Sequence, residues 1–509
     1  MTTTEPTGTA GAALAHASPR DPHHERRWLA LGVILIAQMM LLLDATIVNV
    51  ALPSMQADLG FSDALRGWVV TAYLLAFGSL LLLGGRLADS FGRKNMFIVG
   101  LVGFAVASAV AGAAPNIGTL ITARAVQGGF AAVMAPAALS LITVIFTNLK
   151  ELNKAFAIFG AVAGSSAAFG LLLGGLLTDY ANWRWTMYVN VAFAAVGIIG
   201  GLALLHNSAE TDKPKLSVPS TLVGTAAIFG VVFGWAKAQT DGWGATITLV
   251  SLIAGAALLA GFVVLQKVDR HPLVPLRVVA DRNRGAGLLT LLLGQAAVFG
   301  LFLFLTYYFQ GVLNYSPIKT GLAFLPMMVT VALVATFTQS VLVPRLTTRA
   351  IVASGLAIGG AGTALLTQAD ATSNYAAWVL PGLILAGVGI GSAIVSAVGL
   401  AQMGAEPRDA GAAGALNNVA QQLGAALGIA VISTFVATAT SNYLTHHGST
   451  TAQVAVDATV HGFSVGFWWA AGAFWAGAVI CGALIRPGTR FHQEPGQPEP
   501  LDEIVGGLI

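Results

Sequence analysis

Long apolar runs alternate with short polar segments along almost the whole chain. Most of the runs are about 18 to 25 residues long, which is the length that a helix rising 1.5 Å per residue needs to cross roughly 30 Å of hydrocarbon. The pattern predicts fourteen membrane-spanning helices. The predicted spans are 28–50, 65–85, 96–114, 118–146, 155–178, 186–205, 219–237, 245–266, 287–312, 319–342, 350–368, 374–400, 410–437 and 462–485.

Composition and charge support a membrane protein with both termini in the cytoplasm. Of the 509 residues, 56% are hydrophobic and only 9% are charged, which is too apolar for a soluble domain. With the N-terminus inside, twenty of the 25 Lys and Arg residues fall in cytoplasmic segments and four in outer segments. Because basic residues collect on the cytoplasmic side, this asymmetry predicts a multi-pass protein of the cell's inner (plasma) membrane. The net charge of +3 therefore reflects topology, and we expect no nucleic-acid partner.

The order of the spans predicts an all-α integral membrane protein built as six, two and six helices. The inner loop "GRLADSFGRKNMF" after the second span has a weak counterpart, "VPRLTTRAIVASG", after the tenth. Two related six-helix halves are the usual construction of a transporter whose central site opens to each side in turn. The predicted parts are a disordered cytoplasmic tail (1–27), the N-terminal half (28–205), a cytoplasmic linker (206–218), two inserted helices (219–266), a cytoplasmic loop (267–286), the C-terminal half (287–486) and a second disordered cytoplasmic tail (487–509).

Several other chemistries are disfavoured. The single cysteine, Cys481, excludes an intrachain disulfide. His446, His447 and His461 are predicted to lie on a long outer loop, too sparse for a metal site. No GxxxxGK[ST] loop is present, which argues against nucleotide-driven transport. We therefore expect no enzyme activity, no metal and no cofactor, with a proton gradient as the source of energy.

The first span, "LLLDATIVNVALP", contains the only acidic residue in any predicted span, Asp44. A carboxylate in hydrocarbon must be paired, hydrated or protonated, and such residues mark proton or substrate pathways. Arg124 is the only basic residue away from the ends of a span. It lies roughly 10 Å below the outer end of the fourth span, and Asp44 lies roughly 9 to 12 Å below the outer end of the first. Both are expected to face the central cavity. Depth does not fix azimuth, so they either pair directly or each satisfy other polar groups, such as Asn49 or Gln38.

Five stretches in order carry a resemblance to a known family. They are "LDATIVNVALP", "GRLADSFGRK", "LITARAVQGGFAA", "GAVAGSSAAFGLLLGG" followed by "NWRWTMYVN", and "YYFQGVLNYSPIKTGLAFLP". On these motifs the chain resembles the major facilitator superfamily, specifically its fourteen-span drug:proton antiporter branch. The resemblance implies two six-helix halves, alternating access and a proton-handling role for Arg124. Asp44 is predicted to be the coupling carboxylate, because burial favours its protonated form.

The loop motif GxLaDxxGRK predicts a conformational gate formed by Gly85, Asp89 and Arg93. In the family the Asp of this motif faces the N-terminus of a helix in the opposite half and holds the inner side shut, an interaction that the helix dipole favours. The expected partner is the start of the thirteenth span near Gly411, with Asp409 close by. The alternative is that the basic residues simply anchor the loop to lipid headgroups.

The fifth span predicts close packing between helices of the two halves through a stripe of small residues. The stripe consists of Gly160, Gly164, Gly170, Gly174 and Gly175. The family's antiporter pattern has a proline at the position of Leu171, so an expected kink is missing here while close packing is retained.

Candidate substrate-binding residues combine aromatic rings with amides. They are Gln38, Gln127, Phe302, Tyr307, Tyr308, Gln310, Asn417 and Gln421. The rings could instead face lipid, and the amides could form hydrogen bonds between helices.

The sequence thus predicts a proton-coupled exporter of bulky amphipathic compounds, including antibiotics. A translocator of lipids or lipid conjugates on the same scaffold is the alternative. The expected partners are small amphipathic substrates, protons and membrane lipids, and we expect a monomer.

Overall fold

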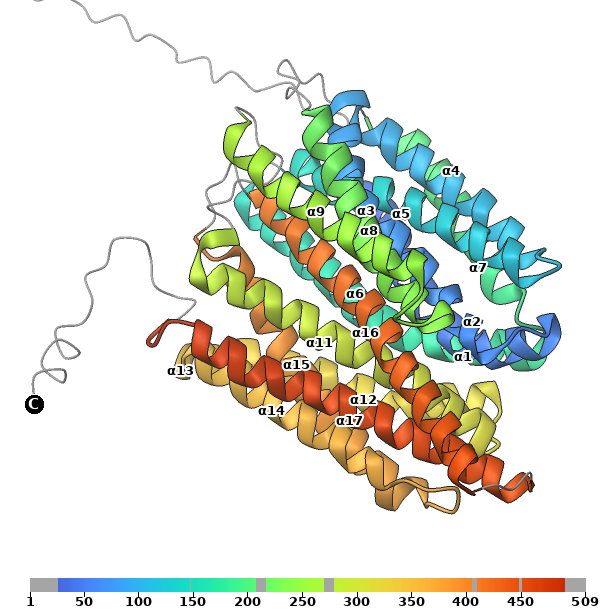
Figure 1. The fold of residues 1–509 in the computed structure, drawn as a ribbon. Coiled ribbons are helices and arrows are strands. Elements are labelled where there is room, and N and C mark those ends of the chain that lie inside the picture. Colours follow the sequence, from blue (N-terminus) through green and yellow to red (C-terminus); the bar gives the residue numbers. More distant parts are fainter. Residues whose placement is uncertain are drawn as a thin grey trace, which may run out of the picture.

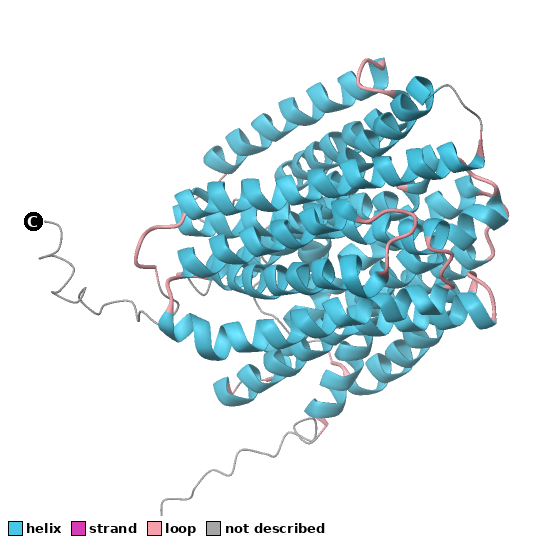
Figure 2. Cartoon of the chain, turned by 90° about the horizontal axis from the view of Figure 1, so that it is seen from below, coloured by secondary structure: helices cyan, strands magenta, loops and turns pink. Residues whose placement is uncertain are grey.

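The computed structural model describes residues 26–146, 148–206, 217–269, 279–404, 410–447 and 451–489, and these residues are almost entirely helical. Figure 2 shows helices joined by loops, without strands in this part of the chain. Fourteen helices within these residues are long and apolar enough to cross a membrane. The predicted number of spans and the all-helical fold class are therefore confirmed.

The N-terminal half consists of the helices drawn from blue to cyan-green in Figure 1. They are α1 (Arg27–Leu59), the short α2 (Asp63–Arg66), α3 (Trp68–Phe91), α4 (Arg93–Gly112), α5 (Ile117–Ile145), α6 (Leu149–Tyr180) and α7 (Trp185–Leu204). The inserted pair, α8 (Val218–Asp241) and α9 (Thr246–Val268), follows in green.

The C-terminal half lies below the N-terminal half in Figure 1, coloured yellow to red. It contains α11 (Arg282–Tyr307) with a π-helical end η1 (Tyr308–Val312), α12 (Pro317–Phe337) with η2 (Thr338–Leu342) and α13 (Val343–Arg345), α14 (Thr348–Leu365) with η3 (Leu366–Gln368), η4 (Tyr375–Val379) with α15 (Leu380–Gln402), α16 (Ala410–His447) and α17 (Ala452–Leu484).

Polar side chains cap the starts of helices, and a glycine caps the end of α1. The Asn116 side chain accepts from the Thr119 backbone N–H at the start of α5, and Asp281 accepts from the N–H groups of Asn283 and Arg284 at the start of α11. Gly60 closes α1 with a φ of 65°, a conformation that glycine adopts without steric cost. The ends of the spans are thus set by local capping chemistry as well as by hydropathy.

The prediction of a long outer loop between the last two spans is wrong. The helix α16 continues to His447 and α17 begins at Ala452, so His446, His447 and His461 lie on helices. The apolar pattern marks only the part of a helix that lies in lipid. The polar continuation stays helical because side chains one turn apart stack, as the rings of Tyr443 and His447 do at 4.0 Å between centroids.

The inserted pair lies beside both halves. The helix α8 packs against α3 of the N-terminal half and against α16 of the C-terminal half. One of its contacts joins the rings of Trp68 and Phe233, whose centroids are 5.9 Å apart. Figure 1 shows α8 and α9 in front of the region where the two halves meet.

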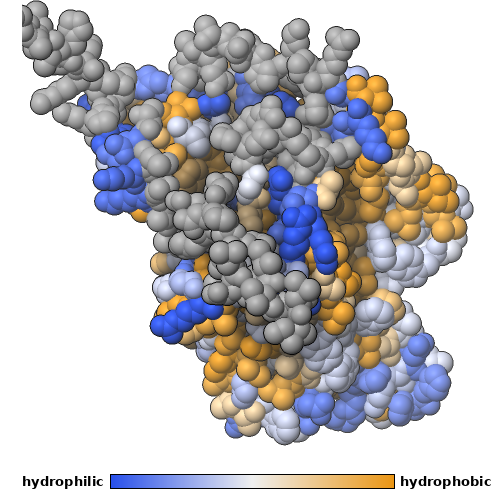
Figure 3. All heavy atoms as spheres, turned by 90° about the vertical axis from the view of Figure 1, so that its left-hand side faces the viewer, coloured by the Kyte–Doolittle hydropathy of each residue, from blue (hydrophilic) through white to orange (hydrophobic). Residues whose placement is uncertain are grey.

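The end that the charge pattern predicts to be cytoplasmic, called here the inner end, is seen in Figure 3. Hydrophilic side chains gather at helix ends on this face, while apolar side chains cover the flanks. The ion pair between Arg27 and Glu151, with 2.6 Å between Nη2 and Oε1, and the hydrogen bond from Arg282 to the Ala483 carbonyl each lie within one half. At the opposite end, called the outer end, hydrogen bonds join the two halves, such as the one from Gln310 to the Val50 carbonyl.

Candidate functional site

A polar cluster lies inside the N-terminal half, enclosed by four helices. It is formed by Asp44 on α1, Ser108 on α4, Arg124 and Gln127 on α5, and Asn190 on α7. Each of the five residues has an exposed fraction of 1% or less. We call this set the Asp44 cluster.

Three side chains donate hydrogen bonds to the Asp44 carboxylate. Arg124 Nη1 lies 2.5 Å from Oδ2, while Gln127 Nε2 and Asn190 Nδ2 lie 2.9 and 2.8 Å from Oδ1. Both amides also donate to the Ser108 hydroxyl oxygen, at 2.7 Å from Gln127 and 3.3 Å from Asn190. The carboxylate is therefore neutralised by one cation and solvated entirely by protein.

The Arg124 guanidinium has further partners besides Asp44. Its Nη1 also donates to Gln127 Oε1 at 2.7 Å, its Nε donates to the Val69 carbonyl at 3.2 Å, and its Cζ lies 4.4 Å from the centroid of the Tyr73 ring. A cation over an aromatic face is stabilised by the ring quadrupole. The arrangement holds a full positive charge in the membrane without exposing it to lipid.

The local sequence explains how these groups come together. Arg124 and Gln127 are three residues apart, so they lie on the same face of α5. A Cβ at Gly128 would lie 2.2 Å from the Tyr73 carbonyl oxygen, so only glycine lets α3 approach α5 here. This approach brings Val69 and Tyr73 to Arg124.

Of the two arrangements that the sequence left open for Asp44 and Arg124, the structure has the direct pair. Neither residue is exposed to a cavity in this state. Gln127, a candidate substrate ligand, hydrogen-bonds Asp44, whereas Gln38 is half-buried and outside the cluster. A buried ion pair is costly to desolvate and is stable only with further hydrogen bonds, which Gln127 and Asn190 supply.

Sequence reasoning missed Ser108 and Asn190. A usable signal was depth: Asn190 lies five residues after the start of α7 and Ser108 four residues before the end of α4, both roughly 6 to 8 Å below the outer end. Polar residues at the depth of Asp44 and Arg124 were candidates for partners of that pair.

The outer ends of the two halves are in contact around η1. The Tyr307 hydroxyl donates to Gln56 Oε1 at 3.0 Å, and Gln310 Nε2 donates to the Val50 carbonyl at 2.8 Å. The Arg66 guanidinium lies 3.5 Å from the centroid of the Tyr307 ring. Two residues predicted to bind substrate thus join the C-terminal half to α1 in this state, and substrate contact by them stays a prediction.

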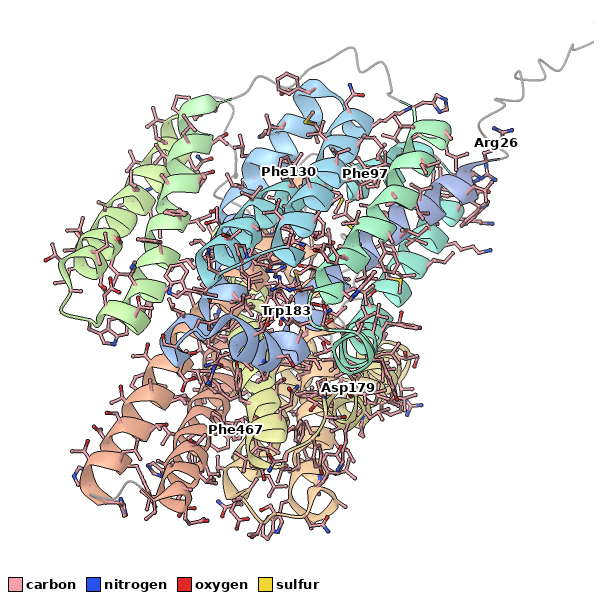
Figure 4. The ribbon with its side chains drawn as sticks, turned by 90° about the vertical axis from the view of Figure 1, so that its right-hand side faces the viewer. Arg26, Phe97, Phe130, Asp179, Trp183 and Phe467 are labelled. Atoms are coloured by element: carbon pink, nitrogen blue, oxygen red, sulfur yellow. The ribbon has the colours of Figure 1, made fainter. Side chains whose placement is uncertain are left out.

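A second contact between the halves joins α6 to α12. A Cβ at Gly175 would lie 2.6 Å from Ile318 Cα, and one at Gly321 would lie 2.5 Å from the Leu171 carbonyl oxygen. The Asp179 carboxylate accepts from the Ile318 N–H at 3.0 Å, at the N-terminus of α12. Figure 4 looks onto this end and shows Asp179 near the middle of the molecule, between the upper and lower helices. We call these contacts, with those around η1, the outer contact.

The rest of the glycine stripe divides along α6. Gly170 packs against Thr46 and Gly174 against Ile47, both on α1, so these two glycines bring helices of the same half together. Gly160 is different, because no atom lies within 4 Å of the place where its Cβ would be. It lies toward the inner end of α6, away from the outer contact, so the predicted close packing is absent there. The surroundings of Gly164 lie outside the described side chains.

The aromatic candidates Phe302 and Tyr308 are buried in the C-terminal half. The rings of Phe302 and Phe324 are 4.9 Å apart between centroids, and the Tyr308 hydroxyl donates to the Asp370 carbonyl at 2.7 Å. Asp370 lies in the outer loop before η4, where hydrogen bonds from Thr372 hold the pKa of its carboxyl group below the usual range. A role of the two rings in substrate binding stays a prediction.

The amides of α16 include one without partners. Gln421 accepts from Gln295 Nε2 on α11 at 3.1 Å and donates to the Asn417 carbonyl at 3.3 Å. The Asn417 side chain is 3% exposed, and neither its nitrogen nor its oxygen has a hydrogen-bond partner. A buried amide without partners is costly, so Asn417 is well suited to receive a polar group of a substrate.

The motif between α3 and α4 forms a tight turn. Gly92 has a φ of 95°, which favours glycine, and Gly84 rather than Gly85 makes the close approach to α5, with a Cβ position 2.0 Å from the Ala132 carbonyl oxygen. Asp89 is half-buried in the last turn of α3 and Arg93 begins α4. Asp409 lies outside the described residues, so the gate role of Asp89 stays a prediction.

Comparison with known proteins agrees with this architecture. The sequence profile of the Major Facilitator Superfamily matches residues 34–429. The puromycin resistance protein pur8 of Streptomyces alboniger is 46% identical over 92% of this chain and 94% of its own length. The cephamycin export protein CmcT of Amycolatopsis lactamdurans is 34% identical over 84% of this chain and 89% of its own length.

Solved structures show the same fold. The POT family transporter PepTSo aligns with a TM-score of 0.67 over 89% of this chain and 97% of its own, at 16% sequence identity. Because the profile covers most of the chain and the relatives cover nearly all of it, the assignment does not depend on one motif. The chain belongs to the major facilitator superfamily, in its branch with fourteen spans, and is a transporter rather than an enzyme.

Proposed function

We propose that the protein exports bulky amphipathic antibiotics from the cytoplasm in exchange for protons, with Asp44 as the group that carries the proton. The relatives named for puromycin resistance and cephamycin export support antibiotic export. The observation that supports proton exchange is the Asp44 cluster, since a carboxylate wholly enclosed in a membrane protein is a functional group by default.

Protonation of Asp44 is the chemical event that the cluster can couple to movement. With Asp44 ionised, the charge of Arg124 is neutralised and the helices α1, α4, α5 and α7 are held together by hydrogen bonds. Adding a proton removes the negative charge and leaves the guanidinium without its counterion in a dry site. Because a buried unpaired charge is costly, the protonated state favours a rearranged N-terminal half.

The outer contact supports an alternating-access cycle in which this structure is the state closed toward the outside. Substrate would then enter from the inner end, and Asn417 and Gln421 would meet its polar groups. Breaking the Tyr307, Gln310 and Asp179 contacts would open the outer side for release. In this proposal both termini lie in the cytoplasm, the membrane is the plasma membrane, and the working unit is a monomer.

The test is transport in inverted vesicles, with uptake of puromycin and proton release recorded together. Asp44→Asn preserves the shape of the side chain but cannot ionise, so we expect substrate-linked proton flux to be lost. The matched control is Asp241→Asn, since Asp241 is an exposed carboxylate paired with Lys237 at the end of α8. Intact proton flux in Asp44→Asn would contradict the proposal.

Lipid cargo is the other outcome of the same assay. If the vesicles take up no antibiotic but redistribute labelled lipid between leaflets in an Asp44-dependent manner, the scaffold carries lipids instead.

A further inference from the structure

The Asp44 cluster contains one feature that the coupling role of Asp44 does not use. Asn190 donates to Asp44 Oδ1 through its Nδ2, at 2.8 Å, but its own Oδ1 is buried and has no hydrogen-bond partner. A buried carbonyl oxygen without a donor is unfavourable, and in a folded protein it calls for an explanation.

Protonation of Asp44 creates the donor that this oxygen lacks. When a hydronium ion of the aqueous phase delivers a proton to Asp44 Oδ1 and leaves as water, one lone pair of that oxygen becomes an O–H donor. The amide N–H groups that point at this oxygen then face a donor. The Gln127 Oε1 is already an acceptor for Arg124 Nη1. Among the side chains that hydrogen-bond Asp44, Asn190 is therefore the one whose acceptor oxygen has no partner.

We infer that Asn190 is the positioning residue that adapts to both protonation states of Asp44, by turning its amide so that Nδ2 serves the carboxylate and Oδ1 serves the carboxylic acid. The inference rests on the proposed function. An amide is suited to this because a half turn about its last torsion exchanges a donor for an acceptor in nearly the same place.

Ser108 can follow the same exchange. Its hydroxyl oxygen accepts from Asn190 Nδ2 at 3.3 Å and from Gln127 Nε2 at 2.7 Å in this structure. After the turn, the hydroxyl proton can rotate toward Asn190 Oδ1, which has two lone pairs and accepts from Ser108 and Asp44 together. The proton count balances: Asp44 gains one proton, and the other groups only change direction.

The charged group that pairs with Asp44 is Arg124 from α5, and the titratable group packed against this pair is Tyr73 from α3, whose ring lies against the Arg124 guanidinium. Both are unchanged by a substitution at Asn190, so a change in the titration of Asp44 reports the amide. Hydrogen bonds to an ion are about twice as strong as those between neutral groups. Removing both the Nδ2 donor and the Oδ1 acceptor of Asn190 therefore destabilises ionised Asp44 more than protonated Asp44.

The experiment is an infrared titration of the purified protein in lipid, following the carboxyl band that disappears in Asp44→Asn. For Asn190→Leu we expect the midpoint to rise by about one pH unit, because the ionised form has lost a donor. For Asn190→Asp we expect a larger rise in the midpoint at which the carboxyl pair loses its last proton, because two adjacent carboxyl groups do not readily ionise together. The pH dependence of proton-coupled uptake should shift to higher pH together with this midpoint.

The matched control is Asn49→Leu. Asn49 is also a buried amide, but its Nδ2 donates to the Ala45 carbonyl on its own helix, so the midpoint should stay at the wild-type value. Asn190→Asp conserves volume and carries the test if Asn190→Leu does not fold. If the folded Asn190 variants keep the wild-type midpoint, the role of Asn190 is overturned while the proposed function stands. Coupled transport by Asp44→Asn would instead overturn the proposed function.

Discussion

At the scale of single residues, the pairing of Asp44 with Arg124 means that neither can be removed without affecting the other. Arg124→Gln leaves the carboxylate without its cation, and breaking a buried pair costs about 3–5 kcal/mol. The double variant Asp44→Asn with Arg124→Gln removes both charges and should lose clearly less than the sum of the single variants.

The measurement is a double-mutant cycle on the free energy of unfolding in detergent. Losses that simply add would show that the two charges are stabilised independently of each other.

The sequence predicted this pair only in part, for a physical reason. The rise of a helix fixes depth, so Asp44 and Arg124 could be placed at one level from residue counts. Which way each side chain points depends on the packing of α1, α3, α5 and α7, and that is set by contacts such as the one between Gly128 on α5 and Tyr73 on α3. Asn190 lies in the motif "NWRWTMYVN", but its direction toward Asp44 is a tertiary property that the motif does not predict.

At the scale of helices, the small residues of α6 have different tasks along its length. Gly175→Val places a branched side chain against Ile318, where a Cβ alone would already lie 2.6 Å from Cα. We expect this variant to open the outer contact. Gly160→Val is the matched control on the same helix, because no atom lies within 4 Å of that position.

Thiol labelling reads out this change. Cys481 is the only cysteine, so Cys481→Ser gives a background without thiols. In that background Val50→Cys, at a buried position on α1, should react faster with an impermeant reagent from the outside when Gly175→Val is present. An equal rate in the Gly175 and Gly160 variants would argue against α6 and α12 as the outer closure.

The loop between α3 and α4 gives the opposite prediction. If Asp89 faces a helix terminus of the C-terminal half in the outward-open state, Asp89→Asn removes an interaction of about 0.3–1 kcal/mol from that state. The inward-open population should increase, seen as faster labelling of cysteines introduced at the inner end. An unchanged rate would favour anchoring of the loop to headgroups.

At the scale of the whole molecule, the scarcity of buried charge limits the substrates. Among the described residues, Asp44 is the only buried carboxylate, and Arg124 already neutralises it. We therefore predict that neutral compounds and monocations are carried better than dications, because a dication has no second acid to stabilise it while a proton is also handled.

Uptake of compounds graded in charge into inverted vesicles should therefore fall sharply from monocations to dications. Efficient transport of a dication would show that another carboxylate, such as Asp179 or Asp63, reaches the substrate.

The overall fold was predictable to a greater degree than the site. Hydrocarbon thickness imposes a minimum length on every apolar run that spans the membrane, and this is why fourteen helices could be counted from the sequence. Hydropathy does not show where a helix continues into water, so the sequence did not predict the extension of α16 to His447. Contacts between the halves, such as the hydrogen bond from Gln310 to Val50, depend on the conformational state and cannot be predicted from hydropathy.

The position of α8 has a consequence for compounds that are already dissolved in the lipid. Because α8 packs on both α3 and α16, protein covers the seam between the halves on that side of the molecule. Sideways access from the bilayer is then left to the opposite seam, between α6 and α12, which is closed at its outer end by Asp179 and Gly175. If the protein works as proposed, we expect a hydrophobic antibiotic to be collected from the inner leaflet along that one flank.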